Sequence, residues 1–218
     1  MVKQFNLKNL KSLAFSQGGR SKSGHISVRH HFRGSKKLLR QVDYRRYLLN
    51  EKARIVRIEQ DPNRTAHLAL LFFRKLGLFS YIISPMNVSQ GAVLGTSDSF
   101  PEVNRKNFVG WSYSLGVVPI SLPIYNIEIK PNSGGIIARA AGTYGCVSRK
   151  YPVEHKSYNF IGLKLPSGKN TFSFRDCLAS LGRVSNRKHH IYDGLLASHS
   201  FYKGIRPDVR GVAMNPVD

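Results

Sequence analysis

Short apolar or alternating segments recur along the chain, separated by turns rich in glycine, proline or asparagine, and no stretch sustains a 3.6-residue hydrophobic period. Alternation of apolar and polar residues predicts half-buried strands. The expected strands cover residues 25–29, 53–59, 67–73, 79–83, 125–130, 146–148, 160–165 and 170–174. The turn at 166–169 joins the last two as a hairpin. Short strands at this spacing favour small β-barrels, so we predict an all-β fold.

The domain organisation follows from a boundary near residues 122–124, which separates two barrels of roughly 75–100 residues. We expect a basic N-terminal arm over 1–24, a first barrel over 25–122, a second barrel over 123–200 and a C-terminal extension over 201–218. The stretch from about 96 to 118 lacks any period and contains the only tryptophan, Trp111, so we expect an insertion there.

Charge narrows the class of partner, because 34 Lys and Arg residues oppose 12 Asp and Glu residues, for a net charge of +22. A free protein with this charge repels itself, so a polyanion is the expected partner. A membrane is disfavoured, because the longest apolar run, residues 68–73, is far short of the roughly 20 residues of a spanning helix. Nucleic acid is therefore the expected partner, and no membrane anchor is expected.

The first 46 residues carry twelve basic side chains and a single acid, Asp43. A basic arm of this kind becomes ordered when a polyanion neutralises it. Residues 1–15 also have the basic, acid-free composition of a transit peptide. Of the two interpretations, we favour an arm held by RNA over a cleaved peptide.

Three segments interleave arginine with glycine and small polar residues: 18–34, 133–145 and 202–211. Glycine allows the main chain to approach a phosphate ridge closely, and arginine binds phosphate or a base edge through two parallel hydrogen bonds. A single such segment is typical of a solvated loop. Three of them in a chain of this charge indicate binding to folded RNA.

The sequence offers little for catalysis or metal binding. The pairs His30-His31 and His189-His190 have no acid or cysteine at metal-ligand spacing, and Cys146 and Cys177 are expected to be reduced thiols. Asp61 belongs to the turn 61–64, where we expect it to orient Arg64. No catalytic residue, metal site or cofactor is expected, although the chain is compatible with structural Mg²⁺ bound through RNA.

Five motifs, at residues 19–30, 59–66, 134–144, 165–168 and 204–218, occur in the order of a known family. The last reads Gly-Ile-Arg-Pro-Asp-Val-Arg-Gly-Val-Ala-Met-Asn-Pro-Val-Asp. Together they resemble the universal second protein of the large ribosomal subunit, in its bacterial and organellar form. The resemblance covers nearly all of the chain from about residue 18.

The resemblance implies an OB-fold barrel followed by an SH3-like barrel, with extended basic tails. It implies a structural, non-enzymatic role among neighbouring ribosomal proteins: binding rRNA near the peptidyl-transferase region and supporting subunit assembly and association. With the basic segments above, it gives the expected rRNA-binding residues: Arg20, Lys22, Arg29, His30, Arg33, Lys36, Lys37, Arg64, Arg139, Thr143, Tyr144, Lys203, Arg206 and Arg210.

The chain departs from the family pattern in two places. The stretch around 97–116 is longer than in the bacterial family, and the His-Pro-His-Gly-Gly-Gly segment that follows Met-Asn-Pro-Val-Asp in the family is absent after Asp218. We expect a second polypeptide to supply that segment. Organellar ribosomes tolerate such rearrangement, so a mitochondrial ribosome is expected, with a plastid as the alternative.

Two other classes compete with a ribosomal protein. A free OB-fold factor binds single strands by stacking bases on an aromatic platform, whereas the aromatic residues here are scattered and Gly-Arg loops dominate. A nucleic-acid-modifying enzyme needs a carboxylate or metal cluster, which the sequence does not offer.

Overall fold

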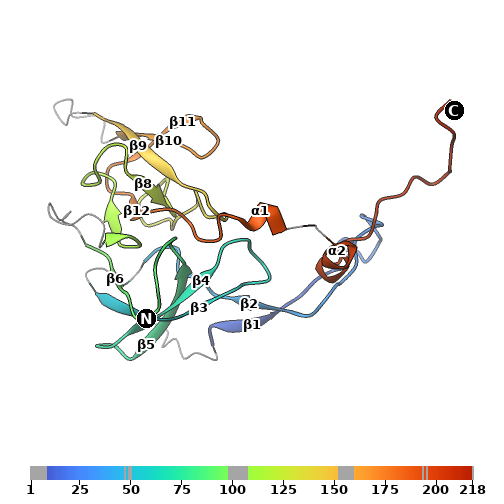
Figure 1. Cartoon of the computed structure of the whole chain (residues 1–218), viewed down its shortest axis with the longest axis horizontal. Helices are drawn as coiled ribbons and strands as arrows, with labels where there is room; N and C mark the ends of the chain where they lie inside the picture. Colours follow the sequence, from blue (N-terminus) through green and yellow to red (C-terminus); the bar gives the residue numbers. More distant parts are fainter. Residues whose placement is uncertain are drawn as a thin grey trace. The chain divides into compact units, whose positions relative to one another are not determined.

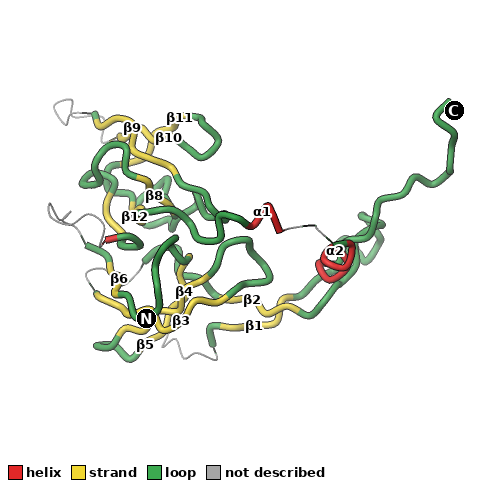
Figure 2. Tube along the Cα trace, viewed as in Figure 1, coloured by secondary structure: helices red, strands yellow, loops and turns green. Residues whose placement is uncertain are grey.

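The computed structural model describes residues 9–46, 48, 51–97, 108–151, 160–192, 194 and 196–217. Within these residues short strands alternate with long loops, and helices are few and short (Figures 1 and 2). The strands are β1 Lys11–Ala14, β2 Lys37–Arg40, β3 Lys52–Glu59, β4 Leu68–Phe73, β5 Leu78–Ile83, β6 Val93–Gly95, β7 Ser112–Ser114, β8 Pro123–Tyr125, β9 Gly145–Lys150, β10 Phe160–Lys164, β11 Asn170–Phe174 and β12 Leu178–Leu181. The helices are α1 His189–Tyr192 and α2 Ala197–Lys203. The predicted all-β class is confirmed.

The chain divides into two compact units, which are described separately. The barrel unit comprises residues 1–12 and 39–189, and the arm unit comprises residues 13–38 and 190–218. β1 and β2 pair in a two-stranded sheet.

The first sheet of the barrel unit has the antiparallel order β5-β4-β3-β6. β4 is its most apolar strand because both of its faces are covered. Ala69, Leu71 and Phe73 pack in one core cluster, whereas Leu68 and Leu70 pack in another with Tyr81. A strand buried on both faces has a continuous apolar sequence, which explains the run at 68–73.

The second sheet has the order β11-β10-β9-β8-β12-β7. Its core contains Leu115, Ile124, Val147 and Leu163, each with 0% relative exposure. β7 lies inside the segment expected as an insertion of the first barrel, yet it pairs with β12 of the second sheet. The division between the sheets therefore falls between β6 and β7, earlier in the chain than the expected boundary at 122–123.

The two sheets pack together within the barrel unit. Ala66 and Ile83, from the first half, belong to the core cluster of the second sheet. An isolated antiparallel bridge joins Pro85 to Val184, and a parallel bridge joins Thr96 to Ser112. These contacts fix the loops that connect the two sheets.

The prediction of a strand at 25–29 is wrong. The backbone N–H groups of Ser27 and Val28 both donate to the carbonyl of Gly19, at 2.9 and 3.0 Å, so the segment closes a loop. Ile26 is 60% exposed, although the alternation placed it on a buried face. Residues 1–8 of the expected arm, and residues 98–107 of the expected insertion, lie outside the described residues.

The strand expected at 125–130 ends at Tyr125. Asn126 has a φ of 50°, in the left-handed region, and this interrupts the strand. The expected alternation is lost beyond that point, because Ile127 and Glu128 are both buried, at 0% and 1% exposure, and Ile129 is 40% exposed. The remaining expected strands coincide with β3, β4, β5, β9, β10 and β11 to within a few residues.

Candidate nucleic-acid interface

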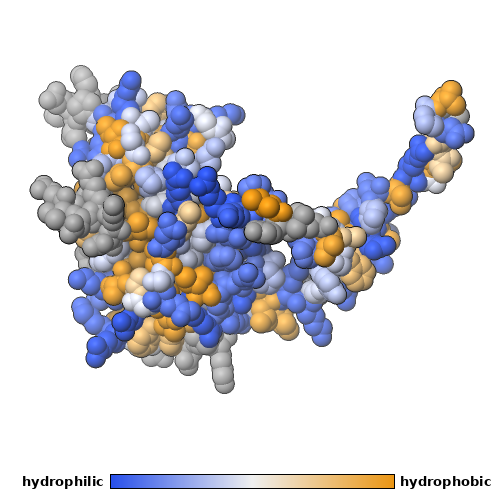
Figure 3. All heavy atoms as spheres, viewed as in Figure 1, coloured by the Kyte–Doolittle hydropathy of each residue, from blue (hydrophilic) through white to orange (hydrophobic). Residues whose placement is uncertain are grey.

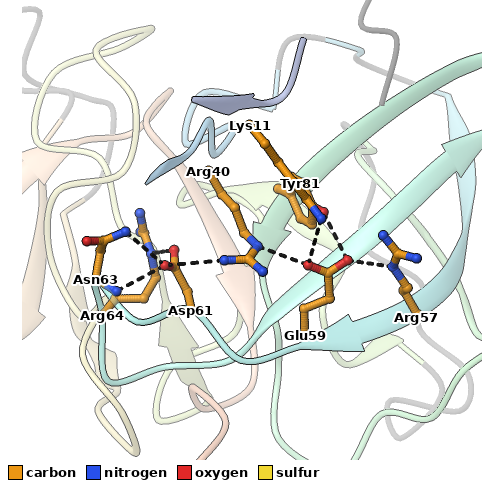
Figure 4. A network of polar contacts seen from close by, with 8 residues as sticks. All are labelled: Lys11, Arg40, Arg57, Glu59, Asp61, Asn63, Arg64 and Tyr81. Atoms are coloured by element: carbon orange, nitrogen blue, oxygen red, sulfur yellow. Dashed lines mark hydrogen bonds and ion pairs between the residues drawn. The ribbon is translucent and has the colours of Figure 1, made fainter. Parts of the chain in front are cut away.

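Glu59, at the end of β3, gathers basic side chains around one carboxylate (Figure 4). Its Oε2 accepts a hydrogen bond from Arg40 Nε at 2.9 Å and lies 3.5 Å from Lys11 Nζ. Its Oε1 accepts hydrogen bonds from Arg57 Nε and from the Tyr81 hydroxyl. Burial alone raises the pKa of Glu59, but the hydrogen bonds from Tyr81, Arg40 and Arg57 lower it below its ordinary value. The carboxylate is therefore ionised at neutral pH.

Asp61 continues the network and organises the turn that follows β3 (Figure 4). Its side chain is 0% exposed, and Oδ1 accepts the backbone N–H of Asn63 at 3.0 Å. Oδ2 accepts a hydrogen bond from Arg64 Nε at 2.7 Å, and Arg40 Nη1 lies 3.7 Å from Oδ1. The expected role of Asp61, a turn residue that orients Arg64, is confirmed.

The Glu59–Asp61 network keeps a surplus of positive charge. Two carboxylates are paired with four cations, from Lys11, Arg40, Arg57 and Arg64. Because the acids are surrounded, they orient the basic side chains without neutralising them all. Such an arrangement leaves cationic groups available for phosphate.

Tyr44 brings Arg64 and Arg139 together. The Arg64 guanidinium donates a hydrogen bond to the Tyr44 hydroxyl. The Arg139 Cζ lies 4.7 Å from the centroid of the same ring, and the Arg64 Cζ lies 6.0 Å from it, both within the range of cation–π attraction. The sequence offered no signal for Tyr44, because its partners lie 20 and 95 residues further along the chain.

The main chain of Tyr44 is fixed by the loop that carries Arg139. The Tyr44 carbonyl accepts the backbone N–H of Gly135 at 3.0 Å and Asn126 Nδ2 at 3.2 Å. A Cβ at Gly135 would lie 2.3 Å from Asn126 Oδ1, so only glycine fits at this close approach. Arg139 Nη1 in turn donates to the Gly135 carbonyl at 3.4 Å.

A second arginine–tyrosine stack lies at the start of β9. The Arg183 Cζ is 4.1 Å from the centroid of the Tyr144 ring, and Tyr144 is 40% exposed. The preceding turn is closed by the Thr143 hydroxyl, which donates to the Ala140 carbonyl at 2.7 Å. Thr143 therefore shapes the loop, whereas Arg183, which the sequence analysis missed, adds a cation.

Thr65 ties together the loops that carry these side chains. Its hydroxyl accepts the backbone N–H of Ala141 at 3.0 Å, and its carbonyl accepts Asn186 Nδ2 at 2.7 Å. The loops after β3, before β9 and after β12 are thus joined by hydrogen bonds. We define the arginine–tyrosine surface as five exposed or half-exposed side chains from these three loops and from the loop after β2: Tyr44, Arg64, Arg139, Tyr144 and Arg183.

The arm unit places a second group of expected residues together. The segment 30–35 runs beside the segment that leaves α2: Phe32 N–H donates to the Gly204 carbonyl at 2.8 Å, and Arg206 N–H donates to the His30 carbonyl at 2.8 Å. The Phe32 and Phe201 rings pack at a centroid distance of 5.1 Å, with their planes tilted by 49°. Gly204 ends α2 in the left-handed conformation, with a φ of 87°.

Basic side chains surround these pairings. Arg20 Nη1 donates to the Gly24 carbonyl at 3.0 Å and closes the first Gly-Arg loop. His30 Nδ1 lies 3.7 Å from Asp208, and the Arg206 Cζ lies 5.8 Å from the Phe201 ring centroid. Arg210 donates to the Met214 carbonyl. These contacts order an arm that carries few acids.

The fourteen expected rRNA-binding residues therefore fall into two groups. Arg64, Arg139, Thr143 and Tyr144 lie in the barrel unit, on or beside the arginine–tyrosine surface. The arm unit contains Arg20, Lys22, Arg29, His30, Arg33, Lys36, Lys37, Lys203, Arg206 and Arg210. Of these ten, His30 and Lys37 are half-buried and the others are exposed. Much of the face drawn in Figure 3 is hydrophilic, as a polar ligand requires.

Other classes of site receive no support from the part of the chain that the structure describes. It contains no group of three or more His, Cys, Asp or Glu side chains placed to hold a metal ion. None of its helices has the length and apolar character needed to cross a membrane. Cys146 and Cys177 are free thiols, and burial raises the pKa of Cys177.

Comparison with known proteins assigns the chain to a family. Residues 7–96 match the family described as Ribosomal Proteins L2, RNA binding N-terminal domain, and residues 108–218 match Ribosomal Proteins L2, C-terminal domain. The two matches meet in the region where the two sheets divide.

Similar proteins extend the match to nearly the whole chain. The large ribosomal subunit protein uL2 of Ehrlichia chaffeensis is 39% identical over 211 residues, which cover 97% of this chain and 72% of that protein. The uL2 protein of Orientia tsutsugamushi is 40% identical over 212 residues, 97% of this chain and 73% of that protein. That of Agrobacterium fabrum is 39% identical over 204 residues, 93% of this chain and 69% of that protein. With both domains matched in order, the chain belongs to the family of Ribosomal Proteins L2.

Proposed function

We propose that this chain is a structural, rRNA-binding protein of the large ribosomal subunit and not an enzyme. The observation that carries the proposal is the convergence of Arg64 and Arg139 on Tyr44. Two guanidinium groups from different loops are held at one tyrosine. Arginines oriented in this way bind phosphate oxygens through their planar fork of N–H donors.

The physical role of the surrounding network is to orient these cations before RNA binds. Glu59 accepts a hydrogen bond from Arg40, and Asp61 accepts one from Arg64. Because these arginine side chains are already oriented, fewer side-chain rotamers must be fixed when RNA binds. The guanidinium groups keep unused N–H donors, because an arginine has five. We propose that those donors bind phosphate or 2′-hydroxyl oxygens of folded rRNA.

The arm unit supports the same function by a different route. Its basic side chains lie on the segments 20–37 and 203–210, most of them on long loops, whereas Lys37 begins β2 and Lys203 ends α2. We propose that these tails thread between rRNA helices, where neighbouring ribosomal proteins also bind. Mg²⁺ ions would then bind to the rRNA itself, and the basic side chains of the arm unit would neutralise rRNA phosphates between those ions.

The place of the chain in the ribosome and its cellular compartment are also proposals. We propose that the chain binds near the peptidyl-transferase region and supports subunit assembly and association. We propose a mitochondrial ribosome, with a plastid as the alternative; the bacterial relatives are compatible with an organelle of bacterial origin.

Sedimentation of a tagged copy tests the function. We expect the wild-type chain to migrate with the large ribosomal subunit in a sucrose gradient. The double variant Arg64→Ala/Arg139→Ala should shift toward the top of the gradient. The control Arg54→Ala/Arg74→Ala removes the same charge from β3 and from the turn after β4, and it should stay with the subunit. A wild-type chain found only in the free pool would instead indicate a free nucleic-acid-binding factor.

A further inference from the structure

Exposed and half-buried aromatic side chains gather on one face of the second sheet, on or beside β9, β10 and β11, which carry no residue of the arginine–tyrosine surface. In the register of β10 and β11, Phe160 lies opposite Phe174, and Gly162 lies opposite Phe172. β9 continues the second row, because Arg149 is the partner of Gly162. Tyr151 follows β9 directly. We call Tyr151, Phe160, Phe172 and Phe174 the aromatic face.

Two ring pairs build the aromatic face. The Tyr151 and Phe172 centroids are 5.9 Å apart, and the Phe160 and Phe174 centroids are 4.9 Å apart. Phe172 is 60% exposed, and Tyr151 and Phe174 are each 38% exposed. β11 is the edge strand of its sheet, so no further strand among the described residues pairs beyond it. Four aromatic rings in a cluster present a large area of π surface to a ligand.

Gly162 lies at the centre of this cross-strand row. It stands between Arg149 and Phe172 and contributes no side chain. The residue is buried, and a Cβ placed there would lie 3.0 Å from Ser148 Oγ and 3.6 Å from the Arg149 Cβ, so neighbouring side chains cover it. The register between β9 and β10 shifts directly after Gly162, and a glycine inside a strand often marks such a bulge.

The charge around the aromatic face is positive. β9, β10 and β11 contain no Asp or Glu, and Arg149 and Lys164 are exposed on them. Lys150 does not add to this charge, because it pairs with the buried Ile161, on the other face of the sheet, and donates to the Gly116 carbonyl at 2.8 Å.

We propose that the aromatic face binds unpaired RNA bases by stacking, with Arg149 and Lys164 on the adjoining phosphates. Single-stranded nucleic acid is bound in this way, by aromatic platforms next to a basic groove. The surface needs no sequence preference, because every base has a π face. The positive rim favours a nucleic acid over a protein whose apolar patch would meet uncompensated cations. The proposal rests on the proposed function only for the choice of RNA as ligand.

Photo-cross-linking of the full chain locates the contact. The probe is a ten-nucleotide oligouridylate that carries 4-thiouridine, irradiated with the protein and followed by trypsin digestion and mass spectrometry. We expect cross-links on the peptide 170–175, which contains both Phe172 and Phe174. Cross-links confined to the segments 13–38 and 196–217 and to the arginine–tyrosine surface would overturn the proposal.

Affinity measurements separate stacking from charge. We expect Phe172→Leu to weaken binding of the labelled oligouridylate about tenfold with an unchanged salt slope, because stacking on an aromatic ring contributes a roughly tenfold effect per base. Arg149→Ala should lower the slope of log K against log salt by about 0.7. Phe72→Leu, at a half-buried phenylalanine of the first sheet, is the control and should leave the affinity unchanged.

Parallel titration with large-subunit rRNA distinguishes the two proposals. If the wild-type chain fails to bind that rRNA, the proposed function fails. If it binds the rRNA but Phe172→Leu binds the oligouridylate like wild type, only the stacking proposal is refuted. Loss of a co-purifying ribosomal protein from Phe172→Leu, with oligouridylate affinity unchanged, would assign the aromatic face to a protein instead.

Discussion

Asp61→Asn separates charge from orientation, because the two effects have opposite signs. The substitution raises the net charge by one, so a mechanism based on charge alone predicts tighter RNA binding. It also removes the carboxylate oxygen that holds Arg64 Nε at 2.7 Å. If Arg64 must be oriented to reach RNA, the variant binds more weakly despite its added charge.

The size of each effect follows from the contacts of Asp61. Hydrogen bonds to charged groups contribute about 1.5–3 kcal/mol each, but Arg64 is 22% and Arg40 is 12% exposed, so water replaces part of the loss. The Asn63 N–H retains an acceptor in the oxygen of the new side-chain amide if that amide is oriented toward it. We therefore expect unfolding free energy to fall by about 2–3 kcal/mol, and the melting temperature by about 4–12 °C.

Fluorescence anisotropy with large-subunit rRNA measures the functional consequence. We expect about fivefold weaker binding at a fixed salt concentration, equal to about 1 kcal/mol for one misplaced contact. The slope of log K against log salt should fall by about 0.7–0.9 as one phosphate contact is lost.

Glu51→Gln is the matched control. It makes the same change of charge at a carboxylate that pairs with the exposed Lys75 at 3.4 Å, outside the Glu59–Asp61 network. Its affinity should equal or slightly exceed that of the wild type. Tighter binding by both variants would refute the orientation argument and leave net charge as the determinant.

Three further expectations are independent of Asp61. The pKa of Glu59 is lowered in the folded chain. Its contribution to the free energy of unfolding is therefore present above about pH 4.5 and is lost as pH falls through the folded pKa. The melting temperature should decline on acidification, and it should decline less steeply in Glu59→Gln. Arg139→Lys keeps the charge but loses the planar guanidinium, so rRNA affinity should fall severalfold by anisotropy, whereas Arg54→Lys should change it little; equal losses would mean that charge alone matters at Arg139. Burial raises the pKa of Tyr113 and of Tyr125 to about 12, so ultraviolet titration should show tyrosines that ionise late, one fewer in Tyr125→Phe. The stability contributed by these neutral phenols is complete below pH 10 and is lost as pH rises through about 12.

The strands that the sequence predicted correctly are those whose partners are close in the chain and whose two faces differ. β10 and β11 are an example, since the turn between them fixes the register from Phe160–Phe174 to Lys164–Asn170. The failures have local causes that alternation does not encode. Asn126 adopts a left-handed conformation, and Glu128 is buried because its carboxylate accepts the N–H groups of Gly134 and Leu178.

The candidate site was predictable to the extent that one short segment specifies it. Asp61 and Arg64 share a four-residue turn, and the pattern Asp-Pro-Asn-Arg indicated their contact. Tyr44 was not predictable, because its role depends on loops that only the folded barrels bring together. Arg183 stacks on Tyr144 from 39 residues away, and nothing adjacent to it distinguishes it from other basic residues.

The pairing inside the arm unit has a consequence for synthesis. Phe32 donates its backbone N–H to Gly204, so the two segments of this contact are separated by 172 residues. At translation rates of about 5–20 residues per second, the partner of Phe32 emerges roughly 9–34 s later. Both barrels are complete before the contact can form. The segment around Phe32 therefore stays without this partner while both barrels fold, and it is among the last parts of the chain to reach its final conformation.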